Sequence, residues 1–267
     1  QTTWKGPALK VLVCDITFFP DMAGQKDAKL LCDGSLHPAA FISVDTGLTE
    51  SIKNTSVLEY NLLSAICYMS QRDWTKAYRA LERVITYPSK DKGVSKTMDE
   101  AHKRWLLVGL LKDGKEPTLP SYTATIAKHT YGTLGMPYKN IAGQFSTTNA
   151  GQLKAEVEAN QKLWEDDGTA TLVSEVVAAY QKWQIINLRD IFKRISISQL
   201  RQITLSAETG EILKDDEEAT RLVRGMIETG LLKGELEPGN SGNELYLHFH
   251  DDSDLMTEEE FGQEIAL

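Results

Sequence analysis

The sequence has little of what several protein classes require. Its 267 residues contain only three cysteines, Cys14, Cys32 and Cys67, which are widely spaced and form no CxxC pair. This content excludes a disulfide scaffold, suits a reducing compartment and offers no cysteine-based zinc motif. The longest dense apolar run is residues 105–111, far below the roughly 18 residues that a membrane-spanning helix needs. The composition therefore predicts a soluble chain that does not enter a membrane.

Positive charge is also scarce. Lysine and arginine total 29 against 38 aspartates and glutamates, which gives a net charge of −9. A large nucleic-acid footprint needs clustered positive charge, so the balance argues against one. The remaining composition, 41% hydrophobic and 25% charged, is that of an ordinary globular chain. The length predicts two packed units, or a helical array with a terminal module. The chain starts at Gln1 rather than Met, and we expect it to be a fragment.

The clearest helical signal lies between residues 56 and 88. Apolar residues recur there at three- and four-residue steps, first over 56–69 and then over 74–87. Asp73 can cap the second helix, and Pro88 ends it. Two antiparallel helices joined by a short turn form one tetratricopeptide-like unit, with Ala65, Tyr68 and Ala77 at the packing positions of that repeat. An unrelated helical hairpin is the alternative.

Helical patterns continue as far as residue 195. We expect helices at 98–111, 122–129, 138–144, 153–164 and 172–195. Apolar residues surround much of the last one, which predicts burial on more than one face. Residues 1–195 are therefore predicted to form a helical-repeat, TPR-like domain.

The pattern changes after Ser196. Short amphipathic helices at 198–205 and 215–228 are followed by two strands at 231–236 and 244–249, with a glycine-rich turn between them. This order predicts a winged-helix subdomain over 196–250 with a small antiparallel β-sheet. Residues 251–267 form an acidic tail that leads into the start of a C-terminal helix. The predicted fold is mainly α.

A winged helix can read nucleic acid, but this one has the wrong charge. Residues 196–250 contain five basic and ten acidic side chains, a net of −5. The helix that would enter the major groove begins with the acids of residues 215–218. Repulsion from phosphates should prevent duplex binding, so the sequence predicts a protein-binding module with no nucleic-acid partner.

His248 and His250 are the most metal-like pair in the chain. Alternation along a strand places both on one face, where two nitrogens could bind zinc. Ubiquitin isopeptidase metalloproteases use His-x-His, then seven intervening residues, then Ser-x-x-Asp. That spacing falls here on Glu258 and Phe261, so the serine and the third ligand are missing. The prediction is two exposed histidines on an edge strand, with no catalytic residue, no bound metal and no cofactor. A metal hydrolase that uses these histidines is a distant alternative.

A helical array that leads through a long buried helix into an acidic winged helix has the layout of a PCI domain. Several short segments closely resemble the subunit-three family of the COP-9 signalosome, which contains this domain. They are residues 80–88 (ALERVITYP), 103–115 (KRWLLVGLLKDGK), 119–123 (LPSYT), 145–149 (FSTTN), 167–173 (DGTATLV) and 249–251 (FHD). The similarity covers roughly residues 50–255.

The resemblance implies a scaffold rather than an enzyme. In that family, winged helices of several PCI subunits pair through their strands and C-terminal helices join a common bundle. The assembled complex removes the ubiquitin-like modifier from cullin-RING ubiquitin ligases, with the catalytic residues on another subunit. The implied partners are other PCI subunits and, indirectly, cullin-RING ligases, in the nucleus and cytoplasm. A PCI subunit of the proteasome lid or of a nuclear messenger-export complex is the alternative.

The predicted interface combines the strands with the tail. Short apolar strands at a sheet edge can accept a strand from a partner, although alternation predicts that about half of their residues fill the core. The tail adds the apolar residues available for a final helix. The predicted interface residues are Leu232, Leu236, Leu245, Leu247, Phe249, Leu255, Phe261 and Ile265.

Overall fold

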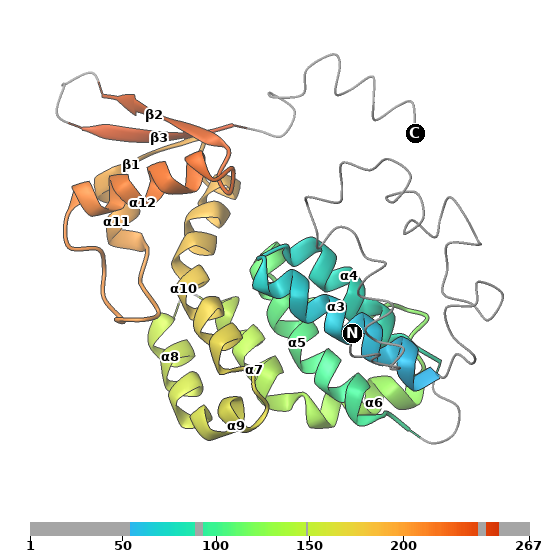
Figure 1. Cartoon of the computed structure of the whole chain (residues 1–267). Coiled ribbons are helices and arrows are strands. Elements are labelled where there is room, and N and C mark those ends of the chain that lie inside the picture. Colours follow the sequence, from blue (N-terminus) through green and yellow to red (C-terminus); the bar gives the residue numbers. More distant parts are fainter. Residues whose placement is uncertain (1–53, 89–92, 148, 240–243, 251–267) are drawn as a thin grey trace, which may run out of the picture. The chain divides into compact units, whose positions relative to one another are not determined.

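The computed structural model describes residues 54–88, 93–147, 149–239 and 244–250 (Figure 1). The chain divides into two compact units after Ala142. Within the described ranges, none of the helices combines the length and the apolar character needed to cross a membrane. The predicted tail, with Leu255, Phe261 and Ile265, lies outside the described residues.

The first unit is built on a helical hairpin. Helix α3 (Asn54–Ser70) and helix α4 (Trp74–Ile85) pack together, and α5 (Lys96–Asp113) packs against both. The Asp73 side chain accepts a hydrogen bond from the Lys76 N–H at 3.0 Å, which caps α4 as predicted. Ala65, Tyr68 and Ala77 are all buried in the packed helices. These three residues, predicted from their spacing to be packing positions, therefore lie in the interface between the helices of the hairpin.

An aromatic cluster joins the next helix to this bundle. Helix α6 (Thr125–Leu134) carries Tyr131, whose hydroxyl donates to the Ile85 carbonyl at 3.0 Å. The Tyr131 ring stacks on His102 of α5 with centroids 4.2 Å apart, and Trp105 lies on α5 at 6.1 Å from the same imidazole. All three aromatic side chains are fully buried. Burial and one hydrogen bond together fix α6 against α5 and α4.

Gly109 lies inside α5, where the helix meets the chain that follows it. A Cβ at Gly109 would lie 2.5 Å from Cγ of Pro117, and the proline ring cannot turn aside as a flexible side chain would. We therefore expect Gly109→Ala to lower the free energy of unfolding by about 1–2 kcal/mol, because overpacking outweighs the better helix propensity of alanine.

The control for this change is Gly132 of α6, in the same unit. A Cβ there meets nothing within 4 Å, so Gly132→Ala should stabilise by about 0.5–1 kcal/mol through helix propensity alone. Denaturant unfolding of both variants measures the difference. Stabilisation by both changes would show that Pro117 can move away at little cost.

The second unit starts within α7 (Met136–Phe145), which runs across the division. Helices α8 (Ala150–Ala159), α9 (Gln161–Asp166) and α10 (Ala170–Asn187) follow. The Tyr180 hydroxyl of α10 donates to the Thr147 carbonyl at 2.6 Å, and its ring meets Phe145 edge-on at 5.5 Å. Those contacts hold α10 to the segment before α8. One expected helix, 153–164, is two: the chain breaks between α8 and α9 at Asn160.

The long helix predicted over 172–195 is wrong at its C-terminal end. Helix α10 stops at Asn187, a 3-10 turn covers Leu188–Asp190, and Arg194–Ser196 form strand β1. Ile195 pairs with Leu247 and is buried. Apolar periodicity extends the predicted helix to Ile195 because it considers only local spacing. In the structure, pairing with Leu247 on β3 makes Ile195 part of a strand instead.

The rest of the second unit is a winged helix. Strand β1 is followed by α11 (Ile197–Ile203), α12 (Asp216–Glu228), β2 (Gly234–Pro238) and β3 (Leu245–Phe249). All pairs are antiparallel, and the sheet order is β1-β3-β2. Buried residues from α10, α11, α12 and the sheet form one core. The predicted fold class, helical units followed by a winged helix with a small antiparallel sheet, is confirmed, with β1 added.

The division after Ala142 differs in position from the predicted change of module at residue 196. It groups the helices α8 to α10 with the winged helix. The domain boundaries at residues 195, 196 and 250 stay predictions.

Candidate protein-interaction surface

The sheet of the winged helix has one buried and one solvent-facing side. Ile195, Leu247 and Leu236 lie opposite one another across the three strands, and they face the core. Arg194, Ser196, Glu235, Glu237, Tyr246 and His248 alternate with them and occupy the other side. An interface formed by side chains of the sheet must therefore use this second, polar set.

Most of the predicted strand interface residues serve the core. Leu247, Phe249 and Leu232 are buried, and Leu236 is half-buried against them. Only Leu245 is exposed, at 38% of its surface. More of the five residues contact the core than the expected half, and among them only Leu245 has an exposed side chain.

Two expectations about the strands need correction. Leu231 and Leu232 precede the strand, because β2 starts at Gly234. His248 and its neighbours lie on the central strand β3, with partners on both sides, rather than on an edge. The central position of β3 depends on its pairing with β1, about 50 residues earlier in the chain, which local alternation does not encode.

The outer edge of β2 is open to a partner strand. The Gly239 N–H donates to the Glu244 carbonyl at 2.7 Å, and the His250 N–H donates to the Lys233 carbonyl at 3.2 Å. Hydrogen-bonded pairs alternate along an antiparallel ladder, so the backbone of Glu235 also faces β3 and that of Leu236 faces outward. Within the described residues, no strand pairs with this outer edge.

The side chains of β2 restrict what can add there. Glu235 and Glu237 make the strand acidic, which disfavours pairing with a second copy of the same edge. Pro238 lacks an N–H and limits the length of an added strand. The strand therefore suits a short partner strand of opposite charge.

Several other apolar residues of the second unit are exposed and were not among the predicted interface residues. Ile191 is exposed at 73%, and Ile203, Ile212 and Leu231 are also exposed. Exposed apolar side chains that form a contiguous patch mark protein-binding surfaces. The apolar pattern placed Ile191 on a buried helix and so predicted burial, whereas its side chain is exposed.

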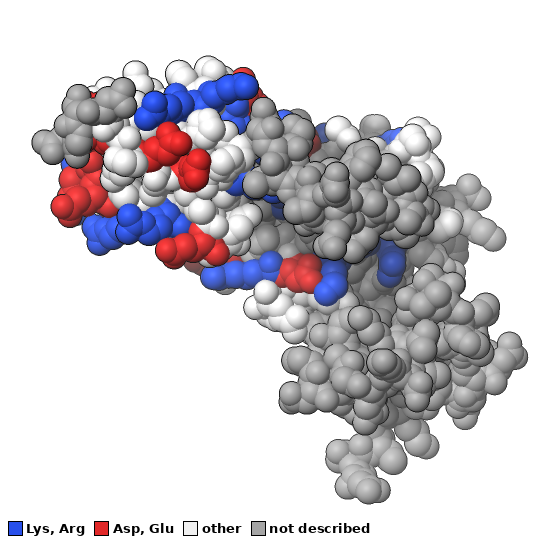
Figure 2. Space-filling view, turned by 90° about the horizontal axis from the view of Figure 1, so that it is seen from above, with Lys and Arg blue, Asp and Glu red and all other residues white. Residues whose placement is uncertain are grey.

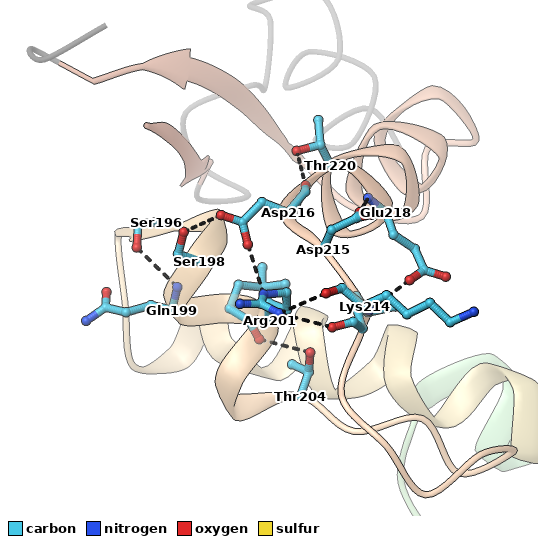
Figure 3. A network of polar contacts seen from close by, with 12 residues as sticks. Ser196, Ser198, Gln199, Arg201, Thr204, Lys214, Asp215, Asp216, Glu218 and Thr220 are labelled. Carbon is cyan, nitrogen blue, oxygen red and sulfur yellow. Dashed lines mark hydrogen bonds and ion pairs between the residues drawn. The ribbon is translucent and has the colours of Figure 1, made fainter. Parts of the chain in front are cut away.

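A polar network joins α11 to the start of α12 in the winged helix (Figure 3). Arg201 Nε lies 2.9 Å from Asp216 Oδ1, and its guanidinium donates to the Leu213 and Lys214 carbonyls at 3.3 and 3.1 Å. Asp215 accepts from the Glu218 N–H at 2.7 Å and caps α12. Arg201 is thus engaged inside the module, and the first turn of α12 presents acids.

Positive charges elsewhere on this unit are dispersed. Arg221 and Arg224 are exposed on α12, one turn beyond those acids. Figure 2 shows lysines and arginines interleaved with aspartates and glutamates on the described part of one face. An interleaved surface lacks the continuous positive field that phosphate binding needs.

Arg194 and Tyr246 form a second polar group on the open side of the sheet. The Arg194 guanidinium lies 4.3 Å over the Tyr246 ring and 3.7 Å from Glu237. The Tyr246 hydroxyl donates to Glu244 at 2.8 Å, and this bond to a carboxylate raises the pKa of Tyr246. Within the described ranges, the only group of three ligating side chains close enough to hold a metal is Glu235, His248 and His250.

These features define a class: a helical protein in which a winged helix follows the helical units and, within the described residues, leaves an edge of its sheet unpaired. Comparison with known proteins is consistent with that class. Residues 39–127 match the family model described as COP9 signalosome complex subunit 3, N-terminal helical repeats.

Two curated relatives carry the same name. The COP9 signalosome complex subunit 3 of Neurospora crassa is 41% identical over 262 residues, which is 97% of this chain and 52% of the relative. That of Emericella nidulans is 30% identical over 240 residues, which is 89% of this chain and 47% of the relative. The chain thus spans about half the length of these relatives. The predicted resemblance to subunit 3 of the COP9 signalosome is confirmed over nearly the whole chain.

Proposed function

We propose that this chain is part of a non-catalytic scaffold subunit of the COP9 signalosome. The observation that carries the proposal is 41% identity to a subunit 3 over 97% of the chain. The complex in which it would assemble removes the ubiquitin-like modifier from cullin-RING ligases. Its direct partners are other PCI subunits and its indirect partners are those ligases, in the nucleus and cytoplasm.

The sheet of the winged helix supports a role in assembly. Within the described residues no strand pairs with the outer edge of β2, and the exposed apolar residues Leu231 and Leu245 lie close to its two ends. Strand addition at an edge uses backbone hydrogen bonds for affinity and side chains for specificity. The acidic β2 would select a strand with basic residues from a neighbouring subunit.

The test is affinity capture of the full-length protein from its native cells, with bound proteins identified by mass spectrometry. Recovery of PCI subunits, a metalloprotease subunit and cullins supports the proposal. Recovery of proteasome-lid or messenger-export proteins instead would replace the assigned complex by one of the alternatives. A full-length protein that captures no PCI subunit would contradict the scaffold role.

A further inference from the structure

Glu235, His248 and His250 converge on the solvent-facing side of the sheet. The register places Glu235 of β2 directly opposite His248 of β3, and His250 follows two residues later. His248 Nδ1 lies 4.0 Å from Glu235 Oε1, and His250 Nε2 lies 3.9 Å from the same oxygen. One ligand atom from each residue lies within 4.8 Å of the others. The third ligand that was absent from the linear motif is thus supplied by the neighbouring strand.

The distances between the ligand atoms are close to those of a tetrahedral metal site. Zinc binds imidazole nitrogen and carboxylate oxygen at about 2.0–2.2 Å, which places neighbouring ligand atoms about 3.3 Å apart. The two nitrogen–oxygen distances of 4.0 and 3.9 Å reach this value through small side-chain rotations. His248 Nδ1 is buried and has no hydrogen-bond partner among the described residues. A metal ion would satisfy that nitrogen.

The backbone holds the three residues in place. Leu247 and Phe249 flank His248 and are both buried in the core, so His248 is fixed on the opposite side. A Cβ at Gly234 would lie 2.5 Å from the His248 carbonyl oxygen, which shows how closely β2 approaches β3 beside Glu235. Ligands on paired strands are positioned more rigidly than ligands on loops.

The donor atoms favour a transition-metal cation. Of the basic groups near the site, Arg194 pairs with Glu237 at 3.7 Å and lies over Tyr246, and Lys233 lies opposite His250 in the β2–β3 ladder. Two imidazoles and one carboxylate are a donor set that suits Zn²⁺ and related transition metals better than Ca²⁺ or Mg²⁺.

From this arrangement we propose that Glu235, His248 and His250 form a binding site for a divalent transition metal of the zinc class. The metal links β2 to β3 across the base of the wing and keeps a fourth position open to water. The site is independent of the proposed scaffold function, because it needs only the winged helix itself.

The experiment is a zinc titration of the purified, chelator-stripped chain in competition with a chromophoric chelator. One zinc ion per chain is expected to bind at micromolar or tighter affinity. His248→Gln, His250→Gln and Glu235→Gln should each weaken binding about tenfold or more, since each removes one of three ligands. Cobalt in place of zinc should give the visible absorption of a tetrahedral site, which His248→Gln removes.

Matched controls separate this site from other ligands. His129→Gln changes an exposed histidine of α6, and Glu228→Gln changes an exposed acid of α12; both should leave zinc affinity unchanged. Circular dichroism of each variant verifies its fold. Zinc binding that survives His248→Gln and His250→Gln, as it would if the cysteines held the ion, overturns the proposal. So does the absence of binding below about millimolar zinc.

Discussion

Replacing Leu247 with lysine is expected to unfold the winged helix, whereas the same change at Leu245 should leave it folded and weaken partner binding. Leu247 is fully buried on the central strand, and Leu245 is 38% exposed at the start of the same strand. Leu247→Lys loses the burial of a leucine and places an amine in an apolar core. We expect it to lower the free energy of unfolding by about 4 kcal/mol.

Leu245→Lys should change stability by less than about 0.5 kcal/mol. Its effect is on association: a lysine at an apolar contact next to the open edge should reduce capture of partner subunits by about tenfold or more. Denaturant unfolding measures the first effect, and quantitative capture by the full-length protein measures the second. Undiminished capture by a folded Leu245→Lys protein would exclude this residue from the interface.

The second large effect concerns His102 and acid stability. Burial, together with the smaller effect of the positive charges of Lys139 and Lys103, lowers the pKa of His102 to about 3. In the unfolded chain the same group has a pKa of about 6.5. Between these two pKa values, His102 is protonated in the unfolded state and neutral in the folded state.

The consequence is a loss of stability at low pH. The contribution of neutral His102 is fully present above pH 6.5 and falls steadily towards pH 3, by up to about 1.4 kcal/mol per pH unit. Between pH 7 and pH 5 the loss from this residue is about 2 kcal/mol. The imidazole makes no compensating bond, since both ring nitrogens lack a partner within the described ranges.

His102→Phe tests this because it retains a stacked ring between Tyr131 and Trp105 but cannot be protonated. Free energies of unfolding at pH 7 and pH 5 are compared for the two proteins, and contributions from carboxylates cancel in the difference. The variant should lose about 2 kcal/mol less than the wild type. An equal loss in both would show that His102 does not control the pH dependence.

The helices could be predicted because their signals are local. The hairpin of α3 and α4 has apolar residues at helical spacing, a capping Asp73 and a closing Pro88, all within about one helix length of where they act. The winged helix could be anticipated from the order of its elements. Strand β1 could not, because three residues carry no usable periodicity and Ile195 continued an apolar helical run.

The interface and the metal-binding group show the same limit. Alternation along the strands predicted that some residues would be buried and others exposed. It did not predict that Leu247 and Phe249 are the buried ones and Leu245 an exposed one. His248 and His250 were visible as a pair. Glu235 was not visible as their neighbour, because only the β2–β3 register places it beside them.

The sequence by itself determined the class of this protein: mainly helical, acidic, without a membrane-spanning helix in its described part, and similar in its short motifs to a signalosome subunit. Only the tertiary structure decided which strand is central and which three side chains meet on the sheet. The physical reason is the sequence separation over which each kind of interaction acts. Helix periodicity and caps act within a few residues, whereas the sheet order depends on pairing between β1 and β3, about 50 residues apart, and the β2–β3 register depends on a hairpin alignment that alternation alone does not fix.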